Sequence, residues 1–274
     1  MSAPQSSVVH ANILLRASAL VYGIAAYLVF LASFLYSVGF IGNFSLPTTI
    51  DRGHLSPPIQ AIGIDLALLS LFAIQHSVMA RPSFKRWWTR FIPDSIERST
   101  YVLLSSLLLL LIFWQWRPIP DTVWSVTNPL AATAITAVWW MGWAVALIST
   151  FLISHFELFG LTQVLKNFFS QKLSAPFFKT PLFYRYVRHP LYFGFLLAFW
   201  VTPSMTAGHL LFALATTGYI LVAVQFEERD LIGTFGQDYR RYRRQVAMLI
   251  PMPQRKIPER ETSIIRDSAV GDKQ

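Results

Sequence analysis

The sequence has no cysteine and few charged residues for a chain of 274 residues. Without cysteine, the chain cannot form disulfides, thiolate zinc sites or a cysteine nucleophile, and its redox compartment stays undetermined. Charged residues make up 14% of the chain and hydrophobic residues 54%. Soluble domains carry about a quarter charged residues. The deficit therefore indicates that lipid surrounds much of this chain.

Several catalytic signatures are also missing. The sequence has no GxGxxG loop, no P-loop, no HExxH and no GxSxG motif. A soluble Rossmann-type methyltransferase or dehydrogenase is therefore not supported, and no metal site is predicted. No internal repeat is visible.

What the sequence does have is long apolar runs. The final run, 191–226, is broken at Thr202-Pro203-Ser204, because proline lacks a backbone donor, and we expect two helices joined by a tight turn. The pattern predicts an all-α integral membrane protein of five or six transmembrane helices, with a helical hairpin last and cofactor-binding segments on the cytoplasmic side. The other four runs approach the roughly 20 residues that cross a bilayer: Ser18–Phe40, Pro58–Met79, Thr100–Trp116 and Pro129–Ile153.

Connections rich in lysine and arginine alternate along the chain with connections that hold few basic residues. The loops 80–98 and 154–188 and the segment after Phe226 are basic, whereas loops 41–57 and 117–128 hold one basic residue each, Arg52 and Arg117. The positive-inside rule then puts both termini and the basic loops in the cytoplasm. The net charge of +9 is thus explained by topology and anionic lipid headgroups, and no nucleic acid partner is predicted.

We expect a single transmembrane domain over residues 1–253, with its catalytic core at about 154–250. The first apolar run is too long for a signal peptide and is predicted to be a retained span. Residues 235–244 predict a basic amphipathic helix on the membrane surface. Residues 254–274 are polar and predict a disordered tail.

Two polar motifs flank the final hairpin. Arg188 and His189 precede Pro190 at a helix N-terminus, which favours a bound anion. The alternative is a basic cap at the membrane interface. Glu227 and Glu228 end the last helix and diverge by about 100°. One of them is expected to hold a cationic or hydroxyl-bearing ligand while the other pairs with an arginine; the alternative is a helix end that enters water.

Histidines mark two further candidate sites. His155 follows the fourth apolar run and could accept a proton, with Glu157 to orient it or bind ligand. His76 lies within the second run, either lining a pocket or making a structural hydrogen bond. The same two alternatives, a pocket-lining residue or a structural hydrogen bond, apply to Asp65 inside that run. For His155, the alternative is a histidine at the rim of an interfacial helix.

These motifs together resemble a known superfamily. Residues 188–194 (RHPLYFG), the hairpin, Glu227-Glu228 and the spacing Phe235-Gly236-x-x-Tyr239-x-x-Tyr242 resemble the C-terminal core of integral membrane methyltransferases. That superfamily includes isoprenylcysteine carboxyl methyltransferases and phospholipid N-methyltransferases. Residues 75–81 (QHSVMAR) and 155–161 (HFELFGL) look most like bacterial methanethiol S-methyltransferases, a likeness that extends over nearly the whole chain.

The resemblance implies transfer of a methyl group from S-adenosylmethionine to methanethiol, giving dimethyl sulfide, in a bacterial inner membrane. It implies that His189, Tyr192 and one of Glu227 and Glu228 bind the cofactor. Arg188 is expected beside them, and Gly194 of the same motif is counted among them. Placing the remaining candidates on the substrate side as catalytic residues is our inference from position: His76, His155 and Glu157.

Three alternatives stay open. The same fold could methylate a prenylcysteine carboxylate, a phospholipid amine or another small thiol. A membrane reductase of the sterol type would bind NADPH instead. A transport or accessory protein would be expected to place polar residues through the full depth of the membrane. The sequence does not indicate the oligomeric state.

Overall fold

The computed structural model describes residues 5–173 and 177–251. Within these residues, five helices are long and apolar enough to cross a membrane. The predicted all-α integral membrane fold is confirmed. The five helices are α1 (Gln5–Ile41), α2 (Pro58–Ala80), α4 (Asp94–Gln115), α5 (Pro129–Ile153) and α9 (Ala207–Phe235).

Shorter elements lie between and after the long helices. Proline occupies the first turn of α2, α5 and α8, where its missing N–H costs nothing. The side chains of Asn128 and Thr206 cap α5 and α9. The shorter elements are α3 (Pro82–Trp88), β1 (Thr122–Ser125), α6 (His155–Leu158), α7 (Leu161–Phe168), the 3-10 turn η1 (Leu182–Arg185), α8 (Pro190–Trp200), β2 (Ser204–Thr206) and α10 (Gln237–Gln245).

The last apolar region is broken where the sequence predicts it. Helix α8 ends at Trp200 and α9 begins at Ala207. The connection is a short strand, β2, rather than the tight turn we expected. β2 pairs antiparallel with β1, which lies in the loop after α4. The backbone N–H and C=O groups of the connection between α8 and α9 therefore find hydrogen-bond partners in that loop.

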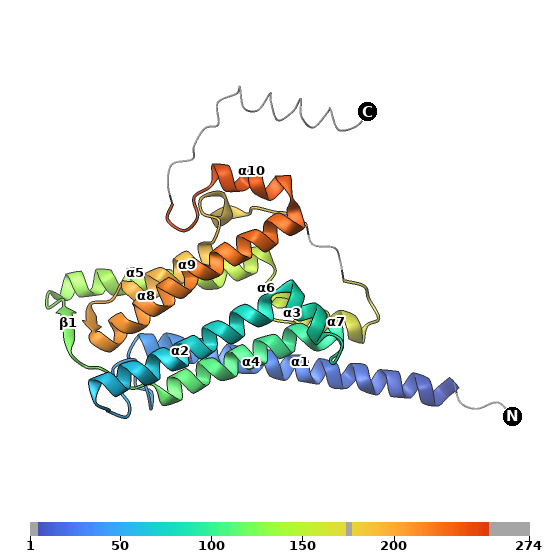
Figure 1. The fold of residues 1–274 in the computed structure, drawn as a ribbon, viewed down its shortest axis with the longest axis horizontal. Helices are drawn as coiled ribbons and strands as arrows, with labels where there is room; N and C mark the ends of the chain where they lie inside the picture. Colours follow the sequence, from blue (N-terminus) through green and yellow to red (C-terminus); the bar gives the residue numbers. More distant parts are fainter. Residues whose placement is uncertain (1–4, 174–176, 252–274) are drawn as a thin grey trace, which may run out of the picture.

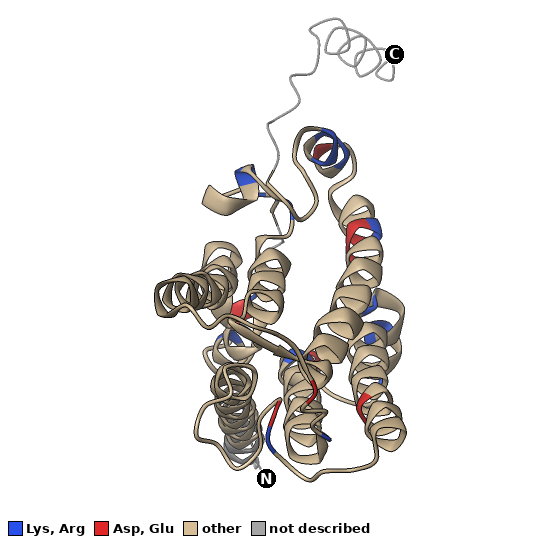
Figure 2. Ribbon diagram, turned by 90° about the vertical axis from the view of Figure 1, so that its left-hand side faces the viewer, with Lys and Arg blue, Asp and Glu red and all other residues tan. Residues whose placement is uncertain are grey.

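The helices are arranged around a common centre. Helix α1 packs along α4, α4 along α2, α2 against α9, α9 against α8, and α8 along α5 (Figure 1). Figure 2 views this arrangement from the side of the β-strands. Segments far apart in the sequence therefore face one another across the centre of the bundle.

Two ends of the bundle differ in composition. The basic connections, with α3, α6, α7 and α10, lie where α2, α5 and α9 end; we call this the basic end. The β1–β2 pair, with Arg52 and Arg117 nearby, lies at the other, the strand end. Buried Asp65 has a structural task there, since its carboxylate accepts the backbone N–H of Arg117 at 2.9 Å.

Helices α5 and α8 approach each other closely through glycine. A Cβ on Gly194 would lie 2.5 Å from the backbone nitrogen of Ala146, and one on Gly142 would lie 2.7 Å from that of Ala198. Real Cβ atoms do not come so near to backbone. Gly194 therefore has a role in helix packing, because it lets α5 and α8 come close together. The cofactor role expected of it stays a prediction.

Helix α10 is amphipathic, as its sequence predicts. Tyr239 and Tyr242 are buried, and both pack against Phe178. Arg240 and Arg241 are exposed. The tail predicted for residues 254–274 lies outside the described residues.

Candidate active site

A cavity of about 640 Å³ occupies the centre of the bundle. Its lining comes from α1, α2, α4, α5, α8 and α9, and at the basic end also from α10 and the segment before α8. The size suits a small ligand or cofactor. Among the described lining residues, the charged ones all lie toward the basic end: Arg81, Arg98, Lys179, Arg188, Glu227 and Asp230.

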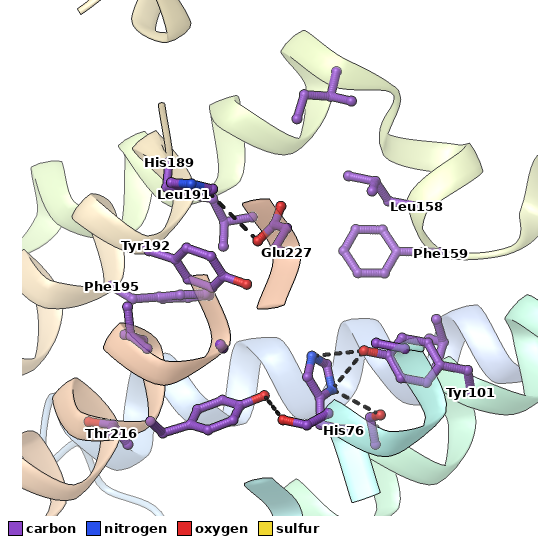
Figure 3. Close-up of a pocket in the computed structure, with 18 of the residues that line it drawn as sticks. His76, Tyr101, Leu158, Phe159, His189, Leu191, Tyr192, Phe195, Thr216 and Glu227 are labelled. Carbon is purple, nitrogen blue, oxygen red and sulfur yellow. Dashed lines mark hydrogen bonds and ion pairs between the residues drawn. The ribbon is translucent and has the colours of Figure 1, made fainter. Parts of the chain in front are cut away.

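At the basic end, α8 and α9 bring three predicted cofactor residues together. His189, Tyr192 and Glu227 all line the cavity. The His189 Nδ1 atom lies 3.7 Å from Oε2 of Glu227, and the rings of His189 and Tyr192 have centroids 5.8 Å apart. Figure 3 shows these side chains grouped on one side of the cavity. The arrangement offers a carboxylate to a cationic or hydroxyl-bearing ligand.

Glu228 faces a different way and is almost completely buried. Its Oε1 atom accepts from Nε of Arg188 at 2.6 Å and lies 3.2 Å from Nε2 of His189. Its Oε2 atom lies 3.4 Å from Nε of Arg243. The guanidinium of Arg188 also donates to the carbonyls of Arg243 and Val246. Glu228 and Arg188 thus neutralise each other and tie α8 to α9 and to the end of α10.

This pairing decides between the two glutamates on geometric grounds. Successive helical residues point about 100° apart. Glu227 lines the cavity and its side chain is 42% exposed, whereas Glu228 is absent from the lining. Arg188 lines the cavity, but Glu228 and two carbonyls already occupy its Nε and one terminal nitrogen.

A tyrosine that we did not select from the sequence also belongs to the basic end. Tyr239 of α10 lines the cavity, is 2% exposed, and has no hydrogen-bond partner for its hydroxyl among the described residues. Burial raises the pKa of Tyr239, so its hydroxyl stays protonated and can donate. A buried donor without a protein partner in the wall of a cavity is available to a ligand or a water molecule there. The Phe235-Gly236-x-x-Tyr239 spacing was the available signal.

A second polar cluster lies across the cavity, on α2, α4 and α9. The ring of His76 is held by the hydroxyl of Tyr101, 2.8 Å from Nε2, and by that of Ser105, 3.2 Å from Nδ1. Tyr219 faces the His76 ring at 6.4 Å between centroids. Each of these side chains lines the cavity, and Figure 3 shows His76 and Tyr101 opposite Tyr192 and Glu227. The sequence analysis missed Tyr101 and Tyr219, which lie in apolar runs without a motif.

His155 is placed elsewhere. It is 5% exposed, its ring stacks on Phe151, and both ring nitrogens are engaged, by the hydroxyls of Tyr27 and Thr150, each at 2.8 Å. Burial lowers the pKa of His155, which favours the neutral ring that these hydroxyls hold. His155 is not among the cavity-lining residues.

Glu157 is exposed and also absent from the cavity lining. The reason is the break at Ser154, where α5 ends and the short helix α6 turns His155 under the fold and Glu157 outward. His155 thus takes a buried position and Glu157 a surface position outside this cavity, and the substrate-side roles expected of them stay predictions. Of the three predicted catalytic residues, His76 alone reaches this cavity.

Comparisons with known proteins agree with the resemblance seen in the sequence motifs. No profile of a known protein family matches the chain, and no solved structure matches it. Methanethiol S-methyltransferase 2 of Bradyrhizobium diazoefficiens is 59% identical over 236 residues, which cover 86% of this chain and 91% of the relative. Methanethiol S-methyltransferase of Mycobacterium tuberculosis is 56% identical over 236 residues, 86% of this chain and 97% of the relative.

A more distant relative is human Nurim, 31% identical over 195 residues, which cover 66% of this chain and 70% of the relative. The bacterial relatives match along most of both chains. The chain belongs to the methanethiol S-methyltransferase family.

Proposed function

We propose that this protein methylates methanethiol to dimethyl sulfide with S-adenosylmethionine as methyl donor. The names of its bacterial relatives support the acceptor. The observation that carries the proposal is that one cavity joins two polar clusters: His189, Tyr192 and Glu227 at the basic end, and His76 with Tyr101 across from them. One cluster is suited to a charged donor, the other to a small acceptor.

The basic end fits the donor chemically. The ammonium and ribose hydroxyls of S-adenosylmethionine are hydrogen-bond donors, which suit the carboxylate of Glu227. The unpartnered hydroxyl of Tyr239 suits an acceptor atom of the same molecule. When bound, this cofactor supplies a methyl group activated by a sulfonium. Arg188 is then a positioning residue, which holds α8 through Glu228.

The chain's own residues orient the reaction and move one proton. The acceptor sulfur forms a bond to the methyl carbon as the bond from that carbon to the donor sulfur breaks. A thiolate is the better nucleophile, and His76 lies within the cavity to take the thiol proton. Tyr101 fixes the ring of His76 through its hydroxyl. Apolar walls exclude water and keep the reacting groups close.

We further propose that the protein lies in a bacterial inner membrane with its basic end in the cytoplasm. The basic connections gather at the end where Glu227 and Tyr239 line the cavity. The positive-inside rule assigns that end to the cytoplasm, where S-adenosylmethionine is made.

The experiment that tests the proposal is headspace gas chromatography on membranes that contain the protein, supplied with S-adenosylmethionine and methanethiol. Dimethyl sulfide is the expected product. Well-folded protein that forms none would overturn the proposal. Parallel assays with a prenylcysteine and with a phospholipid amine test the other acceptors, and a thermal shift with NADPH in detergent tests the reductase alternative.

Glu227→Gln is expected to raise the KM for S-adenosylmethionine by about tenfold to a hundredfold. The reason is the loss of charge-assisted hydrogen bonds, each worth about 1.5–3 kcal/mol. The measurement is methyl transfer at varied cofactor concentration. Glu157→Gln is the matched control, because Glu157 is exposed and outside the cavity lining. An unchanged KM in Glu227→Gln would remove Glu227 from the binding site.

Tyr239→Phe is expected to raise the same KM by about fivefold, the effect of one neutral hydrogen bond. The melting temperature should not fall, because the hydroxyl of Tyr239 has no protein partner to lose. Tyr186→Phe, at an exposed position, serves as control. A loss of stability with normal cofactor binding would contradict the assignment.

A further inference from the structure

The cavity extends well beyond the level of His76. It is lined from Arg81, just after α2, down to Leu69 on α2, and from Phe235 down to Phe212 on α9. Leu69 precedes His76 by seven residues, which is about 10 Å of helix at 1.5 Å per residue. Phe212 precedes Tyr219 by the same interval. Two opposing helices thus line about 10 Å of additional depth toward the strand end.

This deeper part, which we call the deep chamber, is apolar. Most of its wall is hydrocarbon, including Phe34, Leu69, Trp143, Phe199 and Phe212, with Thr216 at its upper edge. The hydroxyls of Ser33 and Ser37, which also line it, bond to carbonyls of their own helix. The aromatic rings contact one another, with 5.5 Å between the centroids of Phe34 and Trp143 and 5.1 Å between those of Phe199 and Phe212. Every charged residue of the described lining lies on the other side of His76, toward the basic end.

Methanethiol is too small to account for this space. Its single carbon would reach no more than the edge of the chamber when its sulfur lies beside His76. The part of the cavity near Glu227 is polar and suits the cofactor, whereas the deep chamber offers mainly contacts for hydrocarbon and no charged group among its described lining residues. A hydrocarbon chain that continues from the acceptor sulfur would fill it.

We infer that the deep chamber binds the carbon chain of larger neutral thiols, so that the protein methylates alkyl and aryl thiols such as 1-butanethiol and thiophenol. The inference rests on the proposed function. The thiol gives its proton to His76, its sulfur bonds to the methyl carbon, and the electron pair of the broken carbon–sulfur bond stays on the donor sulfur. Cysteine and glutathione are excluded, because their charged groups would be buried without partners.

The test measures methyl sulfides from methanethiol, ethanethiol, 1-propanethiol, 1-butanethiol and thiophenol, with S-adenosylmethionine and membranes that contain the full chain. Each added CH2 group is expected to lower the KM of the thiol by about fourfold until the chamber is full. Cysteine and glutathione should give no product. Methanethiol turnover without product from 1-butanethiol would overturn the inference, including the case in which 1-butanethiol inhibits only. No turnover of any thiol would overturn the proposed function itself.

A filling variant links the effect to the chamber. Thr216→Phe adds a ring at the upper edge, and the Thr216 hydroxyl bonds only to its own helix in the described structure. It is expected to lower the turnover of 1-butanethiol relative to that of methanethiol by more than tenfold, because the longer chain needs more of the filled space. Leu214→Phe is the control, since Leu214 is 55% exposed on the same helix. Equal loss for both thiols in Thr216→Phe, or an unchanged preference, would contradict the chamber.

Discussion

His76→Ala is expected to lower kcat for methanethiol by about a hundredfold, the typical contribution of a positioned general base. The residue lines the cavity, and Tyr101 and Ser105 hold its ring in place. The loss should shrink as the pH rises, because the thiol then ionises in solution without help. The measurement is dimethyl sulfide formation across a pH series at saturating cofactor.

His155→Ala is the matched control for this prediction. Hydroxyl groups hold the rings of both histidines, but His155 stacks on Phe151 outside the cavity lining. Its replacement leaves the hydroxyls of Tyr27 and Thr150 without their partner. We expect a lower melting temperature and normal turnover per folded molecule. If both variants keep normal kcat, neither histidine is the base.

Glu228→Ala should destabilise the protein by about 3–5 kcal/mol, the cost of leaving a buried ion pair with one partner. The side chains of Arg188 and Glu228 are 9% and 4% exposed, and Nε lies 2.6 Å from Oε1. Without Glu228, the carbonyls of Arg243 and Val246 are the partners that the guanidinium keeps among the described residues. The measurement is thermal unfolding of the detergent-solubilised protein.

Two further variants separate this effect from general loss of charge. Arg241→Ala removes an exposed charge on α10 and should change stability by less than about 0.5 kcal/mol. The double variant Arg188→Met with Glu228→Leu replaces the ion pair by apolar groups and should recover much of the lost stability. A Glu228→Ala protein as stable as the natural one would show that the ion pair does not hold α8 to α9.

Much of the fold follows from local sequence. A run near 20 apolar residues has to satisfy its backbone groups internally in lipid, so it forms a helix wherever it is placed. This is why the helices and the break after Trp200 could be predicted. The interval between Glu227 and Glu228 also limits them to different directions, since the geometry of a helix is the same in any fold.

The partners of these residues could not be predicted in the same way. Which glutamate faces the cavity depends on where α8 brings Arg188, and that depends on the close approach of α5 at Gly194. Similarly, the break at Ser154 turns His155 under the fold, whereas His76 reaches the cavity because α4 places Tyr101 and Ser105 beside it.

The sequence by itself therefore determined the membrane-spanning helices, the alternation between them of connections rich and poor in basic residues, and the segments that carry the candidate functional residues. These properties depend on hydrophobicity, charge and spacing along one chain. Only the tertiary structure decided that Glu227 lines the cavity, that Tyr239 joins it, and that a deep chamber continues below His76. These depend on contacts between helices distant in sequence, whose geometry no single segment contains.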